Sequence, residues 1–180
     1  MMRSGNLRLT LMFAPIIALT LGSGVAYPAQ SASDSARLAE LEDREAIRLL
    51  LRDYGRLLDE RQFDEFGQLF APDGEYVSAG TTTRGPAAIA ESLRRIMASN
   101  PLGLPEPNYH VLFNDRIVLH GDEAESTSQS LFVAPGAEGA PRLVMMGNYQ
   151  DRFVRTPKGW RFARRVVLPG MAPRPAPKAN

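Results

Sequence analysis

The chain contains no cysteine among its 180 residues. Disulfide bonds, catalytic thiolates, cysteine metal sites and an acylated N-terminal cysteine are therefore excluded by inventory. The chain also lacks a marked charge of either sign, because 21 basic and 20 acidic residues leave a net charge of +1. Neither nucleic acid nor an anionic membrane surface is therefore indicated as a partner. Only two histidines, His110 and His120, are available for proton transfer near neutral pH.

The sequence also lacks the motifs of several enzyme classes. No glycine-rich phosphate loop, serine nucleophile elbow or spaced group of metal ligands occurs in it. Kinase, serine hydrolase and metalloenzyme functions are therefore weakly supported, and we expect no metal and no organic cofactor. The longest apolar run, residues 9–21, is too short to span a bilayer comfortably and is interrupted by Pro15.

What the N-terminus does contain is typical of an export signal. Arg3 and Arg8 flank the start of the apolar run, and the small residues Gly24 and Ala26 follow it at a suitable cleavage position. We therefore predict a signal peptide over residues 1–26 and a mature protein that is periplasmic or secreted. After cleavage we expect no stable membrane insertion. Retention of the segment as an N-terminal anchor is the alternative.

The rest of the chain is predicted to form one domain with unstructured ends. Residues 27–35 are expected to be a disordered linker, and residues 36–168 the folded domain. The last segment, residues 169–180, reads PGMAPRPAPKAN and has almost nothing to bury. Its richness in proline and alanine predicts a disordered tail.

The folded region begins with helices. One helical stripe predicts a long amphipathic helix over residues 36–58, with apolar residues at Ile47, Leu50, Leu51, Tyr54, Leu57 and Leu58. A short helix is expected over 63–70, followed by a strand pair over 75–84. A third helix is expected over 86–100, because Pro86 suits a first helical turn.

The second half is predicted to consist of strands. Four runs, residues 108–120, 124–134, 142–155 and 160–167, are separated by turn residues, and their length indicates curvature or bulges. Helices followed by a meander of long strands predict an α+β fold, in which a bent sheet packs its concave side on the helices. Such an arrangement leaves a cavity that suits a small apolar ligand.

Four segments carry a family resemblance: DYGRLLDERQFDEFGQLFAPDGEYV, RGPAAIAESL, YHVLFNDRIVLHGDEAES and DRFVRTPKGWRFARRVV. The sequence around them, roughly residues 38–168, resembles the SnoaL-like branch of the nuclear transport factor 2-like superfamily. Members include scytalone dehydratase, bile-acid 7α-dehydratase, ketosteroid isomerase and limonene epoxide hydrolase, along with proteins that only bind a ligand. The resemblance implies a conical barrel of a strongly curved, mixed but mostly antiparallel sheet wrapped on three helices. It also implies a homodimer through the outer face of the sheet.

The resemblance also implies candidate catalytic residues. Dehydratase members pair an Asp at the end of the first helix with a His on the strand after the third helix, and Asp59 and His110 match these positions. An imidazole can accept a proton near neutral pH, and a carboxylate on its other nitrogen fixes the tautomer. Tyr54 matches a phenol that donates to the substrate oxygen. The structural alternatives are a loop histidine, a loop acid and a core tyrosine.

Further candidates come from alternation along the strands. Period-2 counting places Trp160, Phe162, Val166 and Arg164 on one face of the last strand and Arg165 on the opposite, solvated face. Arg164 is therefore expected to support the site electrostatically, with a salt bridge at the rim as the alternative.

The polar residues Asn114, Gln129 and Asn148 lie on neighbouring predicted strands and are candidate substrate contacts. Which of them faces inward depends on bulges. The run of residues 125–134, ESTSQSLFVA, has no acid in its interior, where bile-acid dehydratases have a second one.

Two classes of function follow from these residues. The first is a cofactor-independent lyase or isomerase, dehydratase-like, acting on a hydrophobic oxygenated ring compound such as a steroid, terpene or polyketide. In it His110 is the base, Asp59 its orienting partner, Tyr54 the donor to oxygen and Arg164 the support. The second is a protein without catalysis, either a holder of a small hydrophobic molecule or a dimerising interaction module. Contact between Asp59 and His110 at a closed pocket would favour the enzyme.

Overall fold

The computed structural model describes residues 32–101 and 103–170. The predicted signal peptide, residues 27–31 of the predicted linker and residues 171–180 of the predicted tail lie outside the described residues. The first helix, α1, spans Ala32–Asp59. Residues 32–35, predicted as linker, are therefore helical. Asp34 lies in the first turn of α1, where a carboxylate interacts favourably with the helix dipole.

Two short helices follow α1. Helix α2 spans Phe63–Gly67, and α3 spans Pro86–Ser99 with its proline in the first turn, as predicted. Asn100 caps α3 in the left-handed conformation, with φ at 38°. Its side-chain amide exchanges two hydrogen bonds of 2.9 Å with the backbone of Leu104 and so fixes the start of the following loop.

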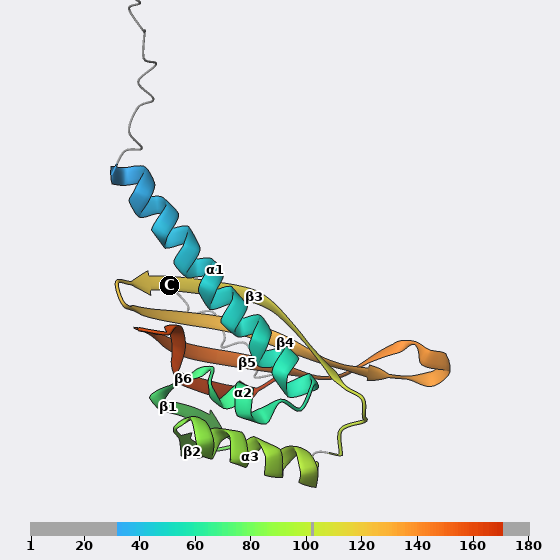
Figure 1. The fold of residues 1–180 in the computed structure, drawn as a ribbon. Helices are drawn as coiled ribbons and strands as arrows, with labels where there is room; N and C mark the ends of the chain where they lie inside the picture. The colour runs from blue at the N-terminus through green and yellow to red at the C-terminus, as the bar shows by residue number, and fades with distance from the viewer. Residues whose placement is uncertain (1–31, 102, 171–180) are drawn as a thin grey trace, which may run out of the picture. The chain divides into compact units, whose positions relative to one another are not determined.

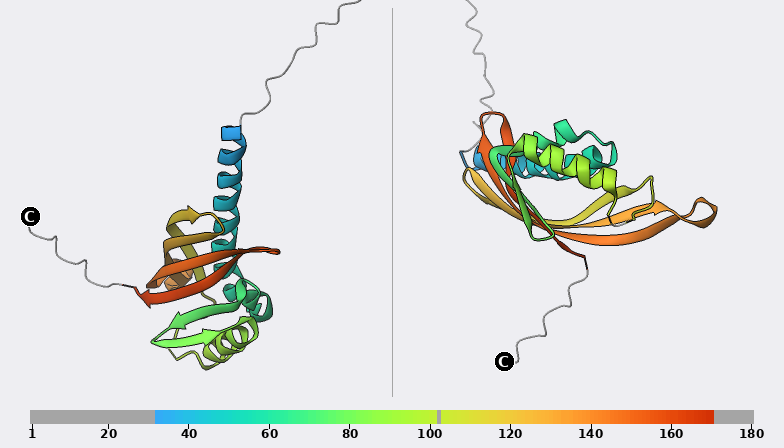
Figure 2. Two further views of the ribbon diagram at one scale, coloured as in Figure 1. Left: turned by 90° about the vertical axis from the view of Figure 1, so that its left-hand side faces the viewer. Right: turned by 90° about the horizontal axis from the view of Figure 1, so that it is seen from below.

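One sheet of six strands makes up the rest of the fold. The strands run in the order β2-β1-β6-β5-β4-β3, with β1 parallel to β6 and every other pair antiparallel. Their bounds are Phe70–Ser78 for β1, Thr81–Arg84 for β2, Tyr109–His120 for β3, Glu123–Pro135 for β4, Pro141–Thr156 for β5 and Gly159–Pro169 for β6. The sheet curves, and the three helices cover its concave side (Figures 1 and 2). The predicted α+β class and the mixed, mostly antiparallel sheet are confirmed.

Strand β1 begins at Phe70, earlier than the strand pair predicted over 75–84, and it runs through Pro72 and Gly74. The register between β1 and β6 shifts between Phe70 and Glu75, so these residues form an irregularity inside the strand. A side chain at Gly74 would have its Cβ 2.7 Å from the carbonyl oxygen of Phe162. The glycine therefore permits close backbone contact here and does not end the strand.

A clamp of four residues holds α1 against the sheet. The Arg155 guanidinium on β5 donates to both carboxylate oxygens of Asp43 at 2.7 and 2.6 Å, and its Nε donates to Asp122 at 2.9 Å. It also stacks over the Trp160 ring, while the indole nitrogen donates to Asp43 at 3.0 Å. This bidentate and stacked arrangement fixes the direction in which α1 crosses the sheet.

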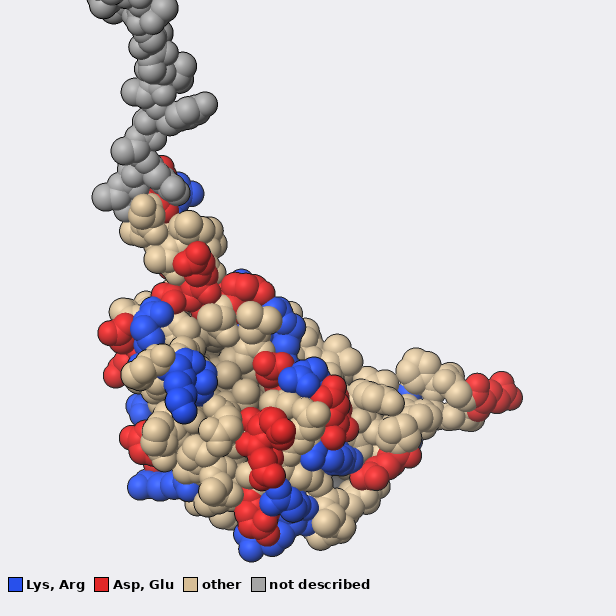
Figure 3. Space-filling view, in the orientation of Figure 1, with Lys and Arg blue, Asp and Glu red and all other residues tan. Residues whose placement is uncertain are grey.

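The surface over the helices carries both signs of charge. Acidic and basic side chains are interspersed on this face of the molecule (Figure 3). Many belong to ion pairs along α1, such as Arg44 with Glu40 and Arg56 with Glu60, each at 2.7 Å. Among the helices described here, none is both long and apolar enough to cross a bilayer.

Candidate active site

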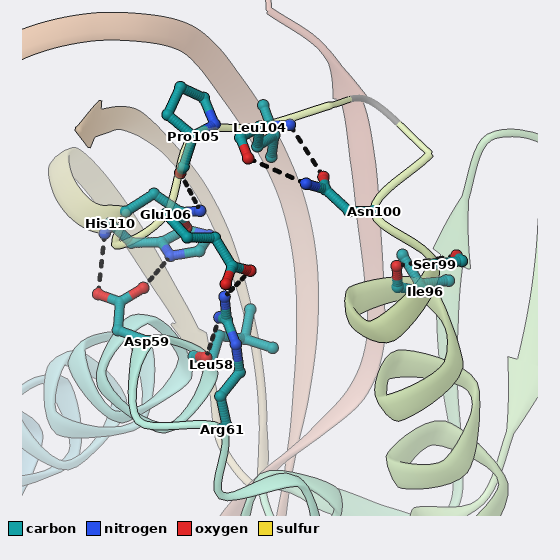
Figure 4. A network of polar contacts seen from close by, with 11 residues as sticks. Leu58, Asp59, Arg61, Ile96, Ser99, Asn100, Leu104, Pro105, Glu106 and His110 are labelled. Carbon is teal, nitrogen blue, oxygen red and sulfur yellow. Dashed lines mark hydrogen bonds and ion pairs between the residues drawn. The ribbon is translucent and has the colours of Figure 1, made fainter. Parts of the chain in front are cut away.

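Asp59 and His110 meet where α1 ends beside edge strand β3. One carboxylate oxygen of Asp59 lies 2.5 Å from His110 Nδ1, and the other accepts the backbone N–H of His110 at 2.9 Å. Figure 4 shows these two contacts. The side chains of His110 and Asp59 are 1% and 13% exposed, respectively. The contact that the family resemblance implied is therefore present, and it fixes both the backbone and the ring of His110.

The carboxylate also determines which nitrogen of His110 can react. An ionised carboxylate only accepts hydrogen bonds, so this network assigns the ring proton to Nδ1 and leaves a lone pair on Nε2. Within the described part of the chain, no hydrogen bond involves Nε2. The ring also packs against Phe132, whose ring centroid lies 3.9 Å from that of His110. The contact with Asp59 therefore leaves Nε2 as the nitrogen of His110 that is available to a ligand.

His110 lines a cavity between the helices and the sheet. The cavity has a volume of about 150 Å³. Its apolar wall comes from α1, α3, the loop before β3 and strands β4, β5 and β6, and it includes Leu58, Ile96, Met97, Leu104, Phe132, Met145, Val167 and Leu168. Asp59 lies behind His110 and borders a groove on the outside of the molecule instead. Asp59 therefore orients the base and does not itself line the cavity.

Three tyrosines, Tyr54, Tyr76 and Tyr149, contribute hydroxyl groups to the cavity wall. The hydroxyls of Tyr54 and Tyr76 lie 3.4 Å apart, and that of Tyr149 lies 3.0 Å from Ser130 Oγ. Burial raises the pKa of Tyr54 well above its ordinary value and also raises the pKa of Tyr76. These two phenols therefore keep their protons and can donate to an oxygen atom in the cavity. Tyr54 was predicted, whereas Tyr76 and Tyr149 were not.

The loop before β3 is tied to the turn after α1. Arg61 donates from Nη2 to Glu106 at 2.8 Å and from Nη1 to the carbonyl oxygen of Leu58 at 2.9 Å (Figure 4). Arg61 and Glu106 both line the cavity and also a more open groove beside it. The pair therefore lies where the cavity and this groove adjoin.

The assignment of faces on β6 was wrong. The register between β5 and β6 shifts between Phe153 and Arg152, so that Phe162 and Arg164 are consecutive partners and Ala163 is an extra residue. This bulge reverses the alternation after Phe162. Arg164 consequently lies on the outer face with its Nη1 2.5 Å from Glu75, and Arg165, predicted to be solvated, is fully buried. Val167 faces the cavity in place of Val166.

Arg165 has a buried acidic partner that sequence reasoning missed. Asp151 on β5 is directly opposite Arg165, and its Oδ2 lies 3.3 Å from the guanidinium and 3.2 Å from Ser126 Oγ. Burial raises the pKa of Asp151 to about 6, although Arg165 and Ser126 act to lower it. The sequence signal was an acid between the buried aromatics Tyr149 and Phe153 at period 2.

The predicted substrate contacts lie outside the cavity. Asn114 donates to Gln129 at 2.8 Å, Gln129 donates to Asn148 at 3.0 Å, and Asn148 donates to the carbonyl oxygen of Gly170 at 2.9 Å. On β4 the buried residues Ser128 and Ser130 flank Gln129, so this chain of amides lies on the outer face of the sheet. The structure therefore assigns these three residues to cross-strand hydrogen bonding and does not bring them to His110.

Metal ligands are not grouped in the described ranges. Residues 32–101 and 103–170 contain no set of three or more His, Asp or Glu side chains placed to hold a metal ion. The cavity brings together the oriented imidazole of His110, phenols that can donate hydrogen bonds and an apolar wall, and these groups suit proton transfer.

Known proteins share both the sequence and the fold. Residues 39–166 match the family model of the SnoaL-like domain. Over 132 residues the chain is 33% identical to Rv2910c of Mycobacterium tuberculosis, described as uncharacterised, covering 72% of this chain and 86% of that protein. It is 32% identical to a nuclear transport factor 2-like protein with a cystatin-like fold from Novosphingobium aromaticivorans. That match has a TM-score of 0.64 and covers 76% of this chain and 88% of the other.

A further solved structure has a similar fold. A protein of Novosphingobium aromaticivorans, provisionally assigned as a scytalone dehydratase, is 24% identical with a TM-score of 0.59. The match covers 76% of this chain and 88% of that one. At this identity the likeness concerns the fold alone. Given the domain match over residues 39–166, the chain belongs to the SnoaL-like family of the nuclear transport factor 2-like superfamily.

Proposed function

We propose that this protein is a cofactor-independent lyase or isomerase of the dehydratase type, acting on a hydrophobic oxygenated ring compound. The observation that carries the proposal is the contact of Asp59 with both the backbone and Nδ1 of His110, while the His110 ring lines the cavity. The dehydratase assignment of a structural neighbour agrees with this chemistry.

The proposed reaction is a proton abstraction next to a carbonyl group. Nε2 of His110 takes a proton from the α-carbon, and the electrons of that C–H bond form an enolate whose oxygen accepts hydrogen bonds from Tyr54 and its neighbours. Asp59 stabilises the imidazolium that results. The enolate then expels hydroxide from the β-carbon, and the imidazolium protonates it to water. In an isomerase the imidazolium instead returns the proton to another carbon.

The size of the cavity restricts the substrate. An apolar cavity of about 150 Å³ in another protein holds benzene, whereas pockets for larger ligands measure about 300–1,000 Å³. The cavity here is about 150 Å³. We therefore propose a monocyclic substrate, smaller than the steroids and polyketides that the sequence suggested.

A simple cyclic β-hydroxy ketone tests the proposal. Purified protein is incubated with 3-hydroxycyclohexanone, and the elimination of water to 2-cyclohexen-1-one is followed by the ultraviolet absorbance of the conjugated enone. We expect catalysis by the wild type and loss of it in His110→Ala. Asp59→Asn keeps the shape but removes the charge, and should reduce the rate by about 100-fold or more, the usual range for general base catalysis.

The second histidine provides the matched control. His120 is exposed at the far end of the same strand, β3. His120→Ala should therefore eliminate water at the wild-type rate. Equal rates for His110→Ala and wild type would contradict the base assignment.

A ligand-binding protein is the second candidate, because the cavity, with its largely apolar wall, would hold a small molecule without any reaction. This function is indicated if cyclohexenone raises the melting temperature of the wild type and of His110→Ala equally while neither protein turns over the hydroxy ketone.

A further inference from the structure

Arg165 is a fully buried cation packed between two tyrosine rings of the cavity wall. Its Cζ lies 3.8 Å from the ring centroid of Tyr54 and 3.9 Å from that of Tyr149. Its side chain is 0% exposed, and the residue does not itself line the cavity. The cation therefore lies behind the phenols as seen from the cavity.

The charge of Arg165 is only partly matched by hydrogen bonds. Nη1 donates to Asp151 at a long 3.3 Å, while Nε and Nη2 have no partner in the described chain. Removing a cation from water is costly, and apolar replacements of buried ion pairs are often neutral or stabilising. Stability of the fold alone therefore gives little reason to keep an arginine here.

The position of the charge suggests a role in the chemistry of the cavity. A cation over the face of an aromatic ring is attracted to it and favours negative charge on that ring and its substituents. It thereby strengthens the phenol as a hydrogen-bond donor. The cationic side chain that lines the cavity directly, Arg61, is already occupied by Glu106 and the carbonyl oxygen of Leu58. Arg165 is therefore the cation best placed to act through Tyr54 and Tyr149.

We propose that Arg165 is a positioning residue that enables the tyrosine wall to bind an oxygen-centred negative charge on a single-ring ligand. It acts through Tyr54 and Tyr149 without touching the ligand. This inference rests on the proposed function, in which these phenols hold the enolate oxygen. It adds that the cavity prefers a ligand with a negatively charged oxygen.

The test compares binding of the neutral and anionic forms of one ring. 4-Nitrophenol is titrated into the purified protein below and above its own pKa, and its two absorption bands report which form binds. The wild type should prefer the anion. Arg165→Met removes the charge at similar volume and should reduce the ratio of anion to neutral affinity by about tenfold, the scale of a desolvated cation–π contact.

Two further variants separate electrostatics from packing. Arg165→Lys keeps a charge without the planar stacking and should restore part of the preference for the anion. Arg152→Met is the matched control, because Arg152 is an exposed arginine of the neighbouring strand β5, and it should bind as the wild type does. Circular dichroism and melting curves establish that each variant is folded.

Several outcomes would overturn the proposal. They are a wild type without preference for the anion, an unchanged preference in folded Arg165→Met, or an equal loss in Arg152→Met. If Arg165→Met does not fold, the double variant Arg165→Met/Asp151→Asn removes both charges, and the same criteria apply to it. If the double variant does not fold either, Arg165 is a structural residue and the proposal is wrong.

Binding and turnover are read separately, so the two proposals can fail independently. A protein that prefers 4-nitrophenolate in an Arg165-dependent manner but does not eliminate water from the hydroxy ketone supports the role of Arg165 and contradicts the proposed reaction. A protein that eliminates water through His110 without any preference for the anion shows the reverse.

Discussion

At the scale of single residues, Asp151 shows how burial changes the chemistry of a carboxyl group. Its side chain is fully buried, and one of its oxygens has no hydrogen-bond partner in the described chain. Burial raises the pKa of Asp151 to about 6 in spite of the nearby Arg165. The folded protein therefore binds a proton here more tightly than the unfolded chain does.

This difference predicts a pH dependence of stability. The pKa of Asp151 is raised on folding, so its tighter proton binding stabilises the folded protein. This stabilisation is fully present below about pH 4 and is lost as the pH rises through about 6. One pKa unit corresponds to about 1.4 kcal/mol, so the loss in unfolding free energy from this group is up to about 3 kcal/mol. Urea unfolding between pH 4 and 7 measures it.

Asp151→Asn is the comparison for this titration. The amide cannot ionise, so its unfolding free energy should lack the part of the pH dependence that the wild type shows between pH 4 and 7. Parallel pH curves for the two proteins would show that Asp151 is already ionised throughout this range.

At the scale of elements, the approach of α1 to β3 depends on Gly55. A Cβ at this position would lie 2.8 Å from Leu112 Cδ1 and 3.1 Å from His110 Cβ. The helix thus approaches the strand closely one turn before Asp59, which brings the carboxylate within reach of His110. A glycine that weakens a helix interior is here required for the active-site contact.

We expect Gly55→Ala to destabilise the protein by about 1 kcal/mol. Overpacking costs about 1–3 kcal/mol, and the better helix propensity of alanine returns about 1 kcal/mol. The displaced strand should also weaken the contact between Asp59 and His110, which the Nδ1 proton signal of His110 reports by NMR.

The double variant Gly55→Ala/Leu112→Ala provides the internal control. Removing the leucine side chain makes room for the new methyl group, so the two substitutions should cost less together than the sum of the single effects. A Gly55→Ala protein more stable than the wild type would show that Leu112 moves aside without consequence.

At the scale of the whole molecule, the outer face of the sheet carries exposed apolar residues. Val111 is 49% exposed and stands in register with Leu131, which is in turn opposite Met146. Tyr109 and Leu143, near the same end of the sheet, are also exposed. We propose that this face binds a second copy of the chain, as the family resemblance implied.

A charge at Val111, one of these exposed apolar residues, should prevent dimer formation. Val111→Glu is expected to be a monomer under conditions where light scattering shows the wild type as a dimer, because an interface core does not tolerate an unpaired carboxylate. Leu38→Glu on α1 is the matched control, since Leu38 is 48% exposed but lies on a helix, away from the sheet. Monomeric wild-type protein, or monomers from Leu38→Glu as well, would contradict the proposal.

The sequence by itself determined the order of elements, the fold class and the family. The period of the apolar residues in α1, the proline that opens α3 and the turn residues between β3, β4, β5 and β6 are local signals, and local signals can be read without the fold. The pair Asp59 and His110 was also found, because matching two positions of a family motif does not require knowing how each strand is twisted.

Only the tertiary structure decided which residues face the cavity. One extra residue at Ala163 in β6 inverts the alternation, so that Arg165 is buried against Asp151 and Arg164 pairs with Glu75 outside. Asn114 in β3 has a positive φ of 54° at a similar irregularity, and with Gln129 and Asn148 it lies on the outer face. Bulges depend on the curvature with which distant strands pair, and residues along one strand do not encode that curvature.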